Sequence, residues 1–184
     1  GVDQVPSAET ADAICDKIAD CVADPAFRPR ALLDRFNIEV ISTTDSATSD
    51  LRHHAKLAGD GLSERVFPTF RPDAVAYLDR STWRADIDEL GKLTGIDTGT
   101  YDGFLDALRS RRAAFVGAGA RATDHGHLLA DTTPMDAKEA GELYARVLDG
   151  AEPTEAEADA FAANMLYQMA EMSCEDGLVM QIHP

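Results

Sequence analysis

The stretch "RATDHGHLL" (residues 121–129) places one carboxylate and two imidazoles, Asp124, His125 and His127, within four positions. It follows small and apolar residues that suit a buried strand. A carboxylate beside an imidazole is the kind of pair that general acid–base catalysis uses. In the alternative interpretation, the stretch is a solvated turn and its histidines have no chemical role. The elements around it bear on the choice.

Hydrophobic patterns predict four short strands separated by helices. The strands are predicted in "NIEVIST" (37–43), "RVFPTF" (65–70), "AGARAT" (118–123) and "LVMQIH" (178–183). Strands that alternate with helices predict right-handed crossovers and a parallel sheet, so the fold class is α/β. Four strands fit part of a doubly wound sheet or half of an eight-stranded barrel, and periodicity does not separate the two.

In both folds, ligands bind at the carboxyl ends of parallel strands. Each predicted strand ends in groups that titrate or form hydrogen bonds: Thr44 and Asp45, Arg71 and Asp73, Asp124 and His125, and His183. Any one of these could belong to a capping turn. Together they predict an acid–base site for an anionic, hydroxyl-rich ligand.

Arg71 is the most informative of these residues. The chain has 184 residues and a formal net charge of −16, so an anionic ligand needs a local cation. A planar guanidinium binds a carboxylate through two parallel hydrogen bonds.

Two other functions are not supported, because "VGAGAR" is an incomplete dinucleotide-binding loop and no G-x-S-x-G motif is present.

Charge and composition exclude other partners. A strongly acidic chain repels polyphosphates, so we expect no nucleic-acid partner. No apolar run reaches the roughly 18 residues of a membrane span, so we expect no membrane partner.

Cys15, Cys21 and Cys174 lack a pairing pattern, which predicts free thiols and a cytoplasmic protein. The missing initial methionine and the apolar final strand indicate a piece of a longer chain.

Four segments resemble, in order, the strand-end motifs of the uronate isomerase (glucuronate isomerase) family of the amidohydrolase superfamily. They are "VISTTDSATSDLRHHAKLA", "RVFPTFRPDAV", "GARATDHG" and "LVMQIHP". The resemblance implies a parallel-stranded part of a (β/α)8 TIM-type barrel with helical insertions. Residues 1–36 would be a helical region before the second barrel strand. Residues 37–184 would hold strands two to five, with insertions at about 79–115 and 135–175.

The resemblance also implies a reaction, the aldose–ketose isomerisation of hexuronates through an enediol. The substrates would be D-glucuronate, which gives D-fructuronate, and D-galacturonate, which gives D-tagaturonate. Arg71 would hold the substrate carboxylate, with Thr44, Asp45 and Asp73 as further substrate-binding residues. Asp124 and His125 would bind sugar hydroxyls or move protons. One departure concerns Asp45-Ser46-Ala47, where the family usually has Asp-Asp-Pro.

A divalent metal, with zinc as the expected ion, is implied in the same way. His183 is the metal-ligand candidate in this sequence, whereas the main ligands, a His-x-His pair and an aspartate, would lie outside it. The expected partner is a small hexuronate, and a homo-oligomer is compatible with the resemblance. The alternatives are a metal-dependent hydrolase of the same superfamily or an inactive excerpt of the barrel. We expect this segment alone to be inactive.

Overall fold

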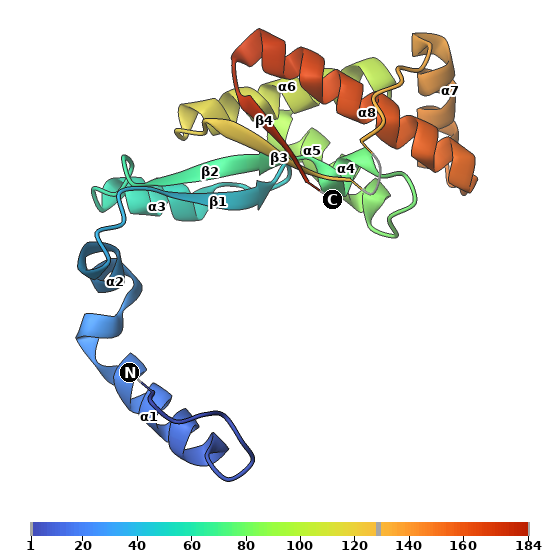
Figure 1. Ribbon diagram of the computed structural model, residues 1–184. Coiled ribbons are helices and arrows are strands. Elements are labelled where there is room, and N and C mark those ends of the chain that lie inside the picture. The colour runs from blue at the N-terminus through green and yellow to red at the C-terminus, as the bar shows by residue number, and fades with distance from the viewer. Residues whose placement is uncertain (1, 128–129, 184) are drawn as a thin grey trace. The chain divides into compact units, whose positions relative to one another are not determined.

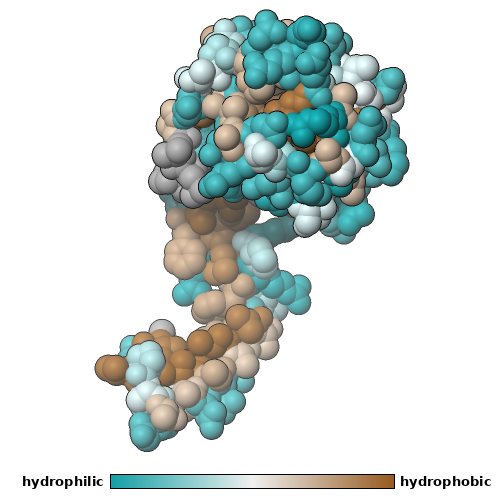
Figure 2. Space-filling model, turned by 90° about the vertical axis from the view of Figure 1, so that its right-hand side faces the viewer, coloured by the Kyte–Doolittle hydropathy of each residue, from teal (hydrophilic) through white to brown (hydrophobic). Residues whose placement is uncertain are grey.

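The computed structural model describes residues 2–127 and 130–183. The chain forms two compact units, Gly1–Ile41 and Ser42–Pro184. The first unit contains α1 (Ala11–Ala23), the short 3-10 helix η1 (Pro25–Phe27) and α2 (Pro29–Arg35). No residue of α1 is buried, and hydrophobic side chains lie along the surface of this unit (Figure 2).

The second unit is built on a parallel four-stranded sheet with the strand order β1-β2-β3-β4 (Figure 1). The strands are β1 (Ile41–Ser46), β2 (Val66–Arg71), β3 (Ala122–Gly126) and β4 (Val179–His183). Each strand pairs with the next one along the chain, and helices lie in every connection. The α/β class and the parallel sheet predicted from the sequence are therefore confirmed.

Helices connect the strands in three groups. The first connection holds α3 (Arg52–Gly59). The second holds α4 (Asp73–Ala76), α5 (Trp83–Thr94) and α6 (Tyr101–Gly117). The third holds α7 (Ala137–Leu148) and α8 (Glu155–Asp176), and α8 begins with the capping box formed by Thr154 and Glu157. The regions predicted as insertions contain α5 and α6, and α7 and α8, respectively.

Three strands end later than the sequence predicted, β2 by the single residue Arg71 and β1 and β3 by three residues each. β1 runs to Ser46 and β3 to Gly126, so Thr44, Asp45, Asp124 and His125 lie inside strands rather than in the loops after them. Aspartate is depleted in strands, but this preference depends strongly on context. In β3 the ladder with β4 overrides it, because all five residues from Ala122 to Gly126 are paired.

The sheet has two faces with different surroundings. On one face, which we call the helix face, the ring of Phe70 packs edge-on against Phe115 of α6, with centroids 5.1 Å apart. Thr123 pairs with Phe70 and shares this face. Successive side chains of a strand point to opposite faces. The opposite face, which we call the Arg71 face, therefore carries Arg71 of β2 and Asp124 of β3.

The hydrophobic core lies among the four longer helices of this unit. The buried ring of Tyr144 in α7 lies 5.3 Å from Trp83 and 5.2 Å from Phe104, measured between centroids. The Trp83 indole Nε1 also donates to the carbonyl oxygen of Val75 at 2.8 Å. This contact fixes the short helix α4, which directly follows Arg71, to the core. Among the described helices, none is long and apolar enough to cross a membrane.

Candidate functional site

Four residues predicted from the sequence meet on the Arg71 face. Arg71 is the last residue of β2, and its Nε donates to Asp73 Oδ2 at 2.6 Å. Its Nη1 lies 3.4 Å from Asp124 Oδ2, and His183 Nε2 lies 2.8 Å from Asp124 Oδ1. The hydrogen bond to Asp73 is the main reason why the pKa of Arg71 is raised, so the guanidinium stays charged. The Arg71 side chain is 35% exposed, which leaves it accessible to a ligand.

Strand alternation explains why these residues meet. His183 pairs with Gly126 across the β3–β4 ladder, and Asp124 lies two residues before Gly126, so both side chains project from one face. Arg71 ends the neighbouring strand, and Asp73 begins α4 immediately after it. The sequence prediction that strand ends bring these groups together is thus correct for this set.

Thr44 and Asp45 separate onto opposite faces. The Ser42 and Thr69 hydroxyls are 2.5 Å apart, which places Ser42 on the Arg71 face and, by alternation, Thr44 as well. Asp45 instead projects toward α3. Its Oδ2 accepts from the Thr43 hydroxyl at 2.6 Å and lies 3.6 Å from His54 Nε2. The substrate-binding role predicted for Asp45 is therefore not supported by its position.

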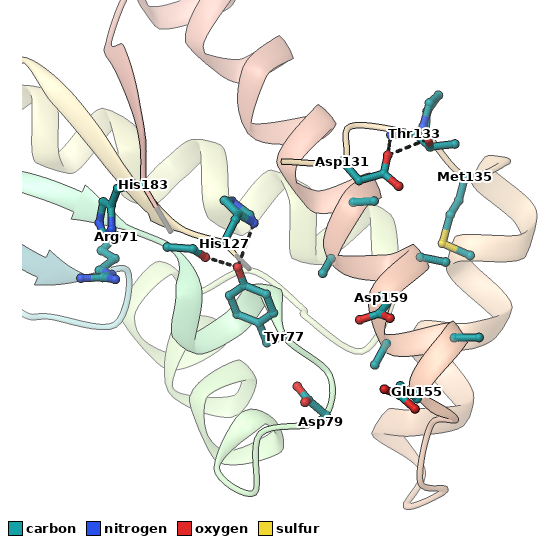
Figure 3. A pocket seen from close by; sticks show the side chains of 17 residues that line it. Arg71, Tyr77, Asp79, His127, Asp131, Thr133, Met135, Glu155, Asp159 and His183 are labelled. Atoms are coloured by element: carbon teal, nitrogen blue, oxygen red, sulfur yellow. Dashed lines mark hydrogen bonds between the residues drawn. The ribbon is translucent and has the colours of Figure 1, made fainter. Parts of the chain in front are cut away.

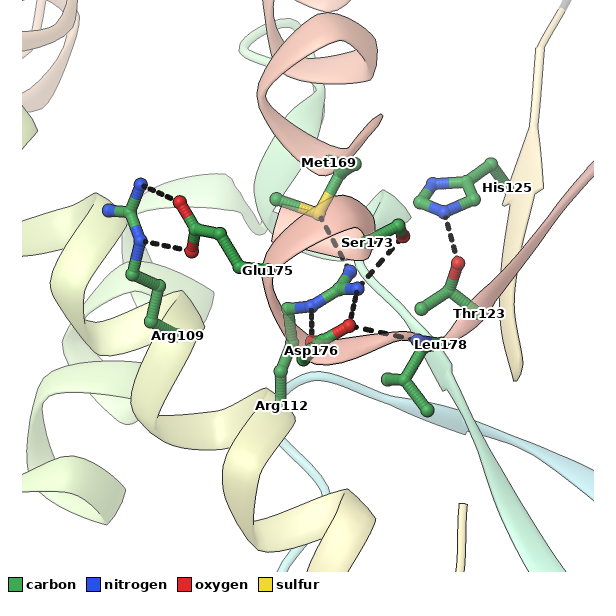
Figure 4. A network of polar contacts seen from close by, with 9 residues as sticks. All are labelled: Arg109, Arg112, Thr123, His125, Met169, Ser173, Glu175, Asp176 and Leu178. Carbon is green, nitrogen blue, oxygen red and sulfur yellow. Dashed lines mark hydrogen bonds and ion pairs between the residues drawn. The ribbon is translucent and has the colours of Figure 1, made fainter. Parts of the chain in front are cut away.

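Asp124 and His125 separate in the same way. His125 is 1% exposed on the helix face, and its Nε2 is 2.7 Å from the Thr123 hydroxyl (Figure 4). Burial, assisted by the nearby His127 and Arg112, lowers the pKa of His125 to about 3. The ring is therefore neutral near pH 7 and lies across the sheet from the Arg71 guanidinium. Its position does not support the catalytic role predicted for it.

Tyr77 and Gly126 are site residues that the sequence did not reveal. The Tyr77 hydroxyl contacts the carbonyl oxygen of Gly126 and lies 2.9 Å from His127 Nδ1. Tyr77 follows α4 in an apolar stretch that gave no sign of a site. His127 belongs to the Asp-His-Gly-His cluster noted in the sequence, but no role could be assigned to it.

A cavity of about 950 Å³ opens beside these groups. Figure 3 shows Arg71 and His183 on one side of it and side chains of α8, including Glu155 and Asp159, on the other. Tyr77 and His127 line the cavity between them. The cavity is thus polar at the strand ends, where Arg71, His127 and His183 line it, whereas alanines of α8 line much of the opposite wall.

The described residues do not by themselves fit a metal centre. Among them, no three His, Cys, Asp or Glu side chains lie close enough together to hold a metal ion. His183, the predicted metal ligand, contacts Asp124. These two side chains could supply at most part of a ligand set, so a metal at this site would need ligands from outside this chain. The metal remains a prediction.

Curated relatives match the chain over its whole length. It is 51% identical over 184 residues to the uronate isomerase of Rhizobium meliloti and 52% identical over 184 residues to that of Rhizorhabdus wittichii. In both comparisons the match covers 100% of this chain but 39% of the relative. The chain therefore spans about two fifths of the length of these relatives.

Solved structures agree with the sequence relatives. The crystal structure of glucuronate isomerase from Caulobacter crescentus superposes with a TM-score of 0.90 at 40% identity, covering 98% of this chain and 38% of that one. Uronate isomerase from Thermotoga maritima gives a TM-score of 0.88 at 31% identity, covering 99% and 40%. These neighbours have the TIM-barrel fold, so the open sheet is part of such a barrel, as predicted. The family model described as glucuronate isomerase matches residues 1–184, and the chain belongs to that family.

Proposed function

We propose that the full-length protein interconverts hexuronates and their keto forms, D-glucuronate with D-fructuronate and D-galacturonate with D-tagaturonate. One observation carries this proposal: an accessible guanidinium, Arg71, stands beside the Asp124–His183 pair at the strand ends of a family-matched barrel segment. A hexuronate has a carboxylate at one end and the reacting carbonyl at the other. The site offers a group suited to the first and a proton-transfer pair for the hydroxyl-bearing chain.

Arg71 would bind the substrate carboxylate through one edge of its guanidinium. Asp73 occupies Nε at 2.6 Å, which fixes the plane of the group. The edge formed by Nη1 and Nη2 remains for a two-pronged contact with a carboxylate, although Nη1 also lies 3.4 Å from Asp124. Holding the far end of an extended sugar chain fixes where its C1 and C2 atoms lie, and such positioning contributes to the rate.

Arg71 alone does not balance the negative charges around it. Asp73 and Asp124 place two carboxylates beside one guanidinium. A substrate carboxylate would be a third, so we infer that a further cation completes the site. This supports a divalent metal, with zinc as the expected ion, bound mainly by residues outside this chain as in the amidohydrolase superfamily. When bound, such an ion would stabilise negative charge on the substrate oxygens.

The isomerisation itself is a redistribution of protons. A base removes the proton on C2 while the C1 carbonyl oxygen gains one, which forms the enediol. A proton is then delivered to C1, and the C2 hydroxyl loses its proton as the C2 carbonyl forms. Asp124, with His183 at 2.8 Å, lies beside Arg71 and would exchange protons with sugar hydroxyls near the carboxylate end, and we assign the base at C2 to no described residue. We assign no step to His125.

Product analysis tests the proposal. The full-length protein is incubated separately with D-glucuronate and D-galacturonate, and the mixture is followed by proton NMR. We expect D-fructuronate and D-tagaturonate, respectively, to appear at equilibrium levels. A protein that leaves both uronates unchanged but cleaves an ester or amide would instead be the superfamily hydrolase, and the proposal would be wrong.

The cellular location is proposed from the state of the cysteines alone. The three cysteines are free, which supports a reducing compartment, and we propose the cytoplasm. A homo-oligomer stays a prediction from the family resemblance. Neither point affects the chemistry at Arg71.

A further inference from the structure

Tyr77 lies at the end of α4 and lines the cavity beside Arg71. We propose that Tyr77 is a positioning residue: its hydroxyl holds the Gly126 backbone beneath the Arg71 guanidinium, and this sets the site's preference for a carboxylate ligand. The inference rests on the proposed function, in which Arg71 binds the hexuronate carboxylate. It adds a residue that would touch neither the substrate nor the reacting atoms.

Gly126 is the surface against which the guanidinium lies. A Cβ atom at this position would be 2.8 Å from Arg71 Nη2 and 3.1 Å from Asp73 Oδ2. Both distances are too short for an ordinary contact, so a side chain at this position would make the guanidinium shift. A shift of the Gly126 backbone toward Arg71 would therefore displace the guanidinium that would bind the carboxylate.

One short segment of the chain holds both the guanidinium and this backbone. The Gly126 amide nitrogen lies 3.5 Å from Asp73 Oδ1, at the long end of hydrogen bonding, and the Gly126 carbonyl oxygen accepts from the Tyr77 hydroxyl. Arg71, Asp73 and Tyr77 span seven residues. Gly126 is therefore held at its amide nitrogen by Asp73 and at its carbonyl oxygen by Tyr77. Removing the Tyr77 hydroxyl leaves only the long contact with Asp73.

The hydroxyl of Tyr77 has a defined direction. Burial raises the pKa of Tyr77 to about 12, so the phenol keeps its proton at working pH. Because a carbonyl oxygen can only accept, the phenol donates to Gly126. The contact of 2.9 Å with His127 Nδ1 must then have the imidazole donating to the phenol oxygen.

The state of His127 agrees with this direction. Burial lowers the pKa of His127, which favours the neutral ring. A neutral ring with its proton on Nδ1 leaves Nε2 as an acceptor, and this buried atom has no partner among the described residues. Hydrogen bonds therefore run from His127 to Tyr77 to Gly126, all in one direction.

Binding of a dicarboxylate tests the proposal without depending on turnover. The affinity of D-glucarate, which carries a carboxylate at each end of a six-carbon chain, is measured by titration calorimetry on three full-length proteins. These are the wild type, Tyr77→Phe and the matched control Tyr167→Phe, whose exposed hydroxyl bonds only Glu171 in the described structure. We expect Tyr77→Phe to weaken glucarate binding about tenfold, the effect of one lost hydrogen bond. Tyr167→Phe should bind like the wild type.

Kinetics with D-glucuronate separate positioning from folding or chemistry. We expect Tyr77→Phe to raise KM about tenfold with kcat within about twofold, because the reacting end is untouched. Gly126→Ala should raise KM further, since its methyl group displaces the guanidinium, whereas Gly59→Ala, with open space around it, should not.

The proposal is overturned if Tyr77→Phe binds glucarate like Tyr167→Phe, or if kcat falls while KM and glucarate affinity stay constant. Failure of the proposed function looks different. In that case the wild type leaves hexuronates unchanged, while the effect of Tyr77→Phe on glucarate binding still decides the positioning role. A wild type that converts hexuronates but binds no glucarate contradicts the preference for a carboxylate ligand, and with it the positioning role, while the proposed activity stands.

Discussion

His125 is a buried imidazole in surroundings that disfavour a positive charge. It is 1% exposed, and besides burial its electrostatic interactions with His127, Arg112 and Arg71 lower its pKa to about 3. Its one described hydrogen bond joins Nε2 to the Thr123 hydroxyl two residues earlier on the same strand. The side chain therefore fills and links the helix face as a neutral group.

This burial predicts that the protein loses stability in acid. The unfolded chain takes up a proton on this histidine below about pH 6.5, whereas the folded state does so only near pH 3. Between these values the unfolded state binds more protons, so the free energy of unfolding falls as the pH falls. From pH 7 to pH 5 the contribution of His125 is about 2 kcal/mol.

Urea unfolding of the full-length protein at pH 7 and pH 5 measures this effect. His125→Asn keeps a polar group near Thr123 but does not titrate, so its loss of stability should be smaller than that of the wild type by about 2 kcal/mol. His53→Asn, at an exposed position, is the matched control. An equal loss in His125→Asn and the wild type would show that His125 already titrates normally in the folded protein.

At the level of residues, the sequence predicted which residues lie near the strand ends better than it predicted which way their side chains point. Arg71, Asp73, Asp124 and His183 were predicted to meet, and they do so because they occupy the ends of neighbouring parallel strands. Asp45 and His125 were assigned to the same site because β1 and β3 were predicted to end before them. Both residues lie within strands, and their side chains point to the face opposite the Arg71 face. Because successive residues of a strand alternate between the two faces, the exact position of the strand end decides whether a residue faces the site.

At the level of elements, α6 and α8 are joined by two arginine–carboxylate pairs in contrasting surroundings (Figure 4). Arg112 is fully buried and contacts Asp176 through Nε at 2.6 Å and Nη2 at 2.9 Å. Arg109 makes a similar forked contact with Glu175, but both side chains are substantially exposed. The two pairs form a natural comparison.

The buried pair also connects the helices to the sheet. Asp176 Oδ1 accepts from the Leu178 amide nitrogen at 3.0 Å, directly before β4 begins. The Arg112 guanidinium lies 5.6 Å from the centre of the Phe70 ring on β2. Burial raises the pKa of Asp176, but the hydrogen bonds from Arg112 and Leu178 outweigh it, so the pKa is lowered overall. The carboxylate therefore stays ionised in the folded protein.

We predict unequal costs for breaking the two pairs. Arg112→Met leaves the Asp176 carboxylate without its cation and should lower the free energy of unfolding by about 3 kcal/mol. Arg109→Met should cost less than about 1 kcal/mol, because water replaces the lost contact. Urea midpoints of the two full-length variants test this, and equal shifts would mean that the Arg112 pair does not stabilise the fold more than a surface pair does.

The elements themselves were largely predictable from sequence. The capping box at Thr154 and the apolar stripes of α5 and α6 follow from local patterns. Strand lengths did not, because pairing with a neighbouring strand that is distant along the chain decides them. The aromatic cluster around Tyr144 was also not predicted, since it joins rings from helices far apart in the sequence.

At the level of the whole molecule, this chain supplies one part of a barrel site. It contributes the Arg71 face of four strands, and its relatives are about two and a half times as long. Because two carboxylates lie beside the single guanidinium of Arg71, we propose that groups elsewhere in the protein complete the site. From sequence alone the barrel could be reached only through the family resemblance, because four alternating strands fit two folds.

We therefore predict that residues 1–184 expressed alone have no isomerase activity. The full-length protein should convert D-glucuronate under the same conditions, as followed by proton NMR. Circular dichroism of the short chain serves as the control for folding. Turnover by the folded short chain would show that the described residues are sufficient for the chemistry.

The central claim is that Arg71 binds the substrate carboxylate while the chemistry occurs at the other end of the sugar. The most direct measurement is the steady-state kinetics of full-length Arg71→Lys with D-glucuronate. Lysine keeps the charge but lacks the two-pronged edge, so KM should rise by about 10- to 100-fold with a much smaller change in kcat. Arg52→Lys, at an exposed position of α3, should match the wild type. An unchanged KM in Arg71→Lys would contradict the account.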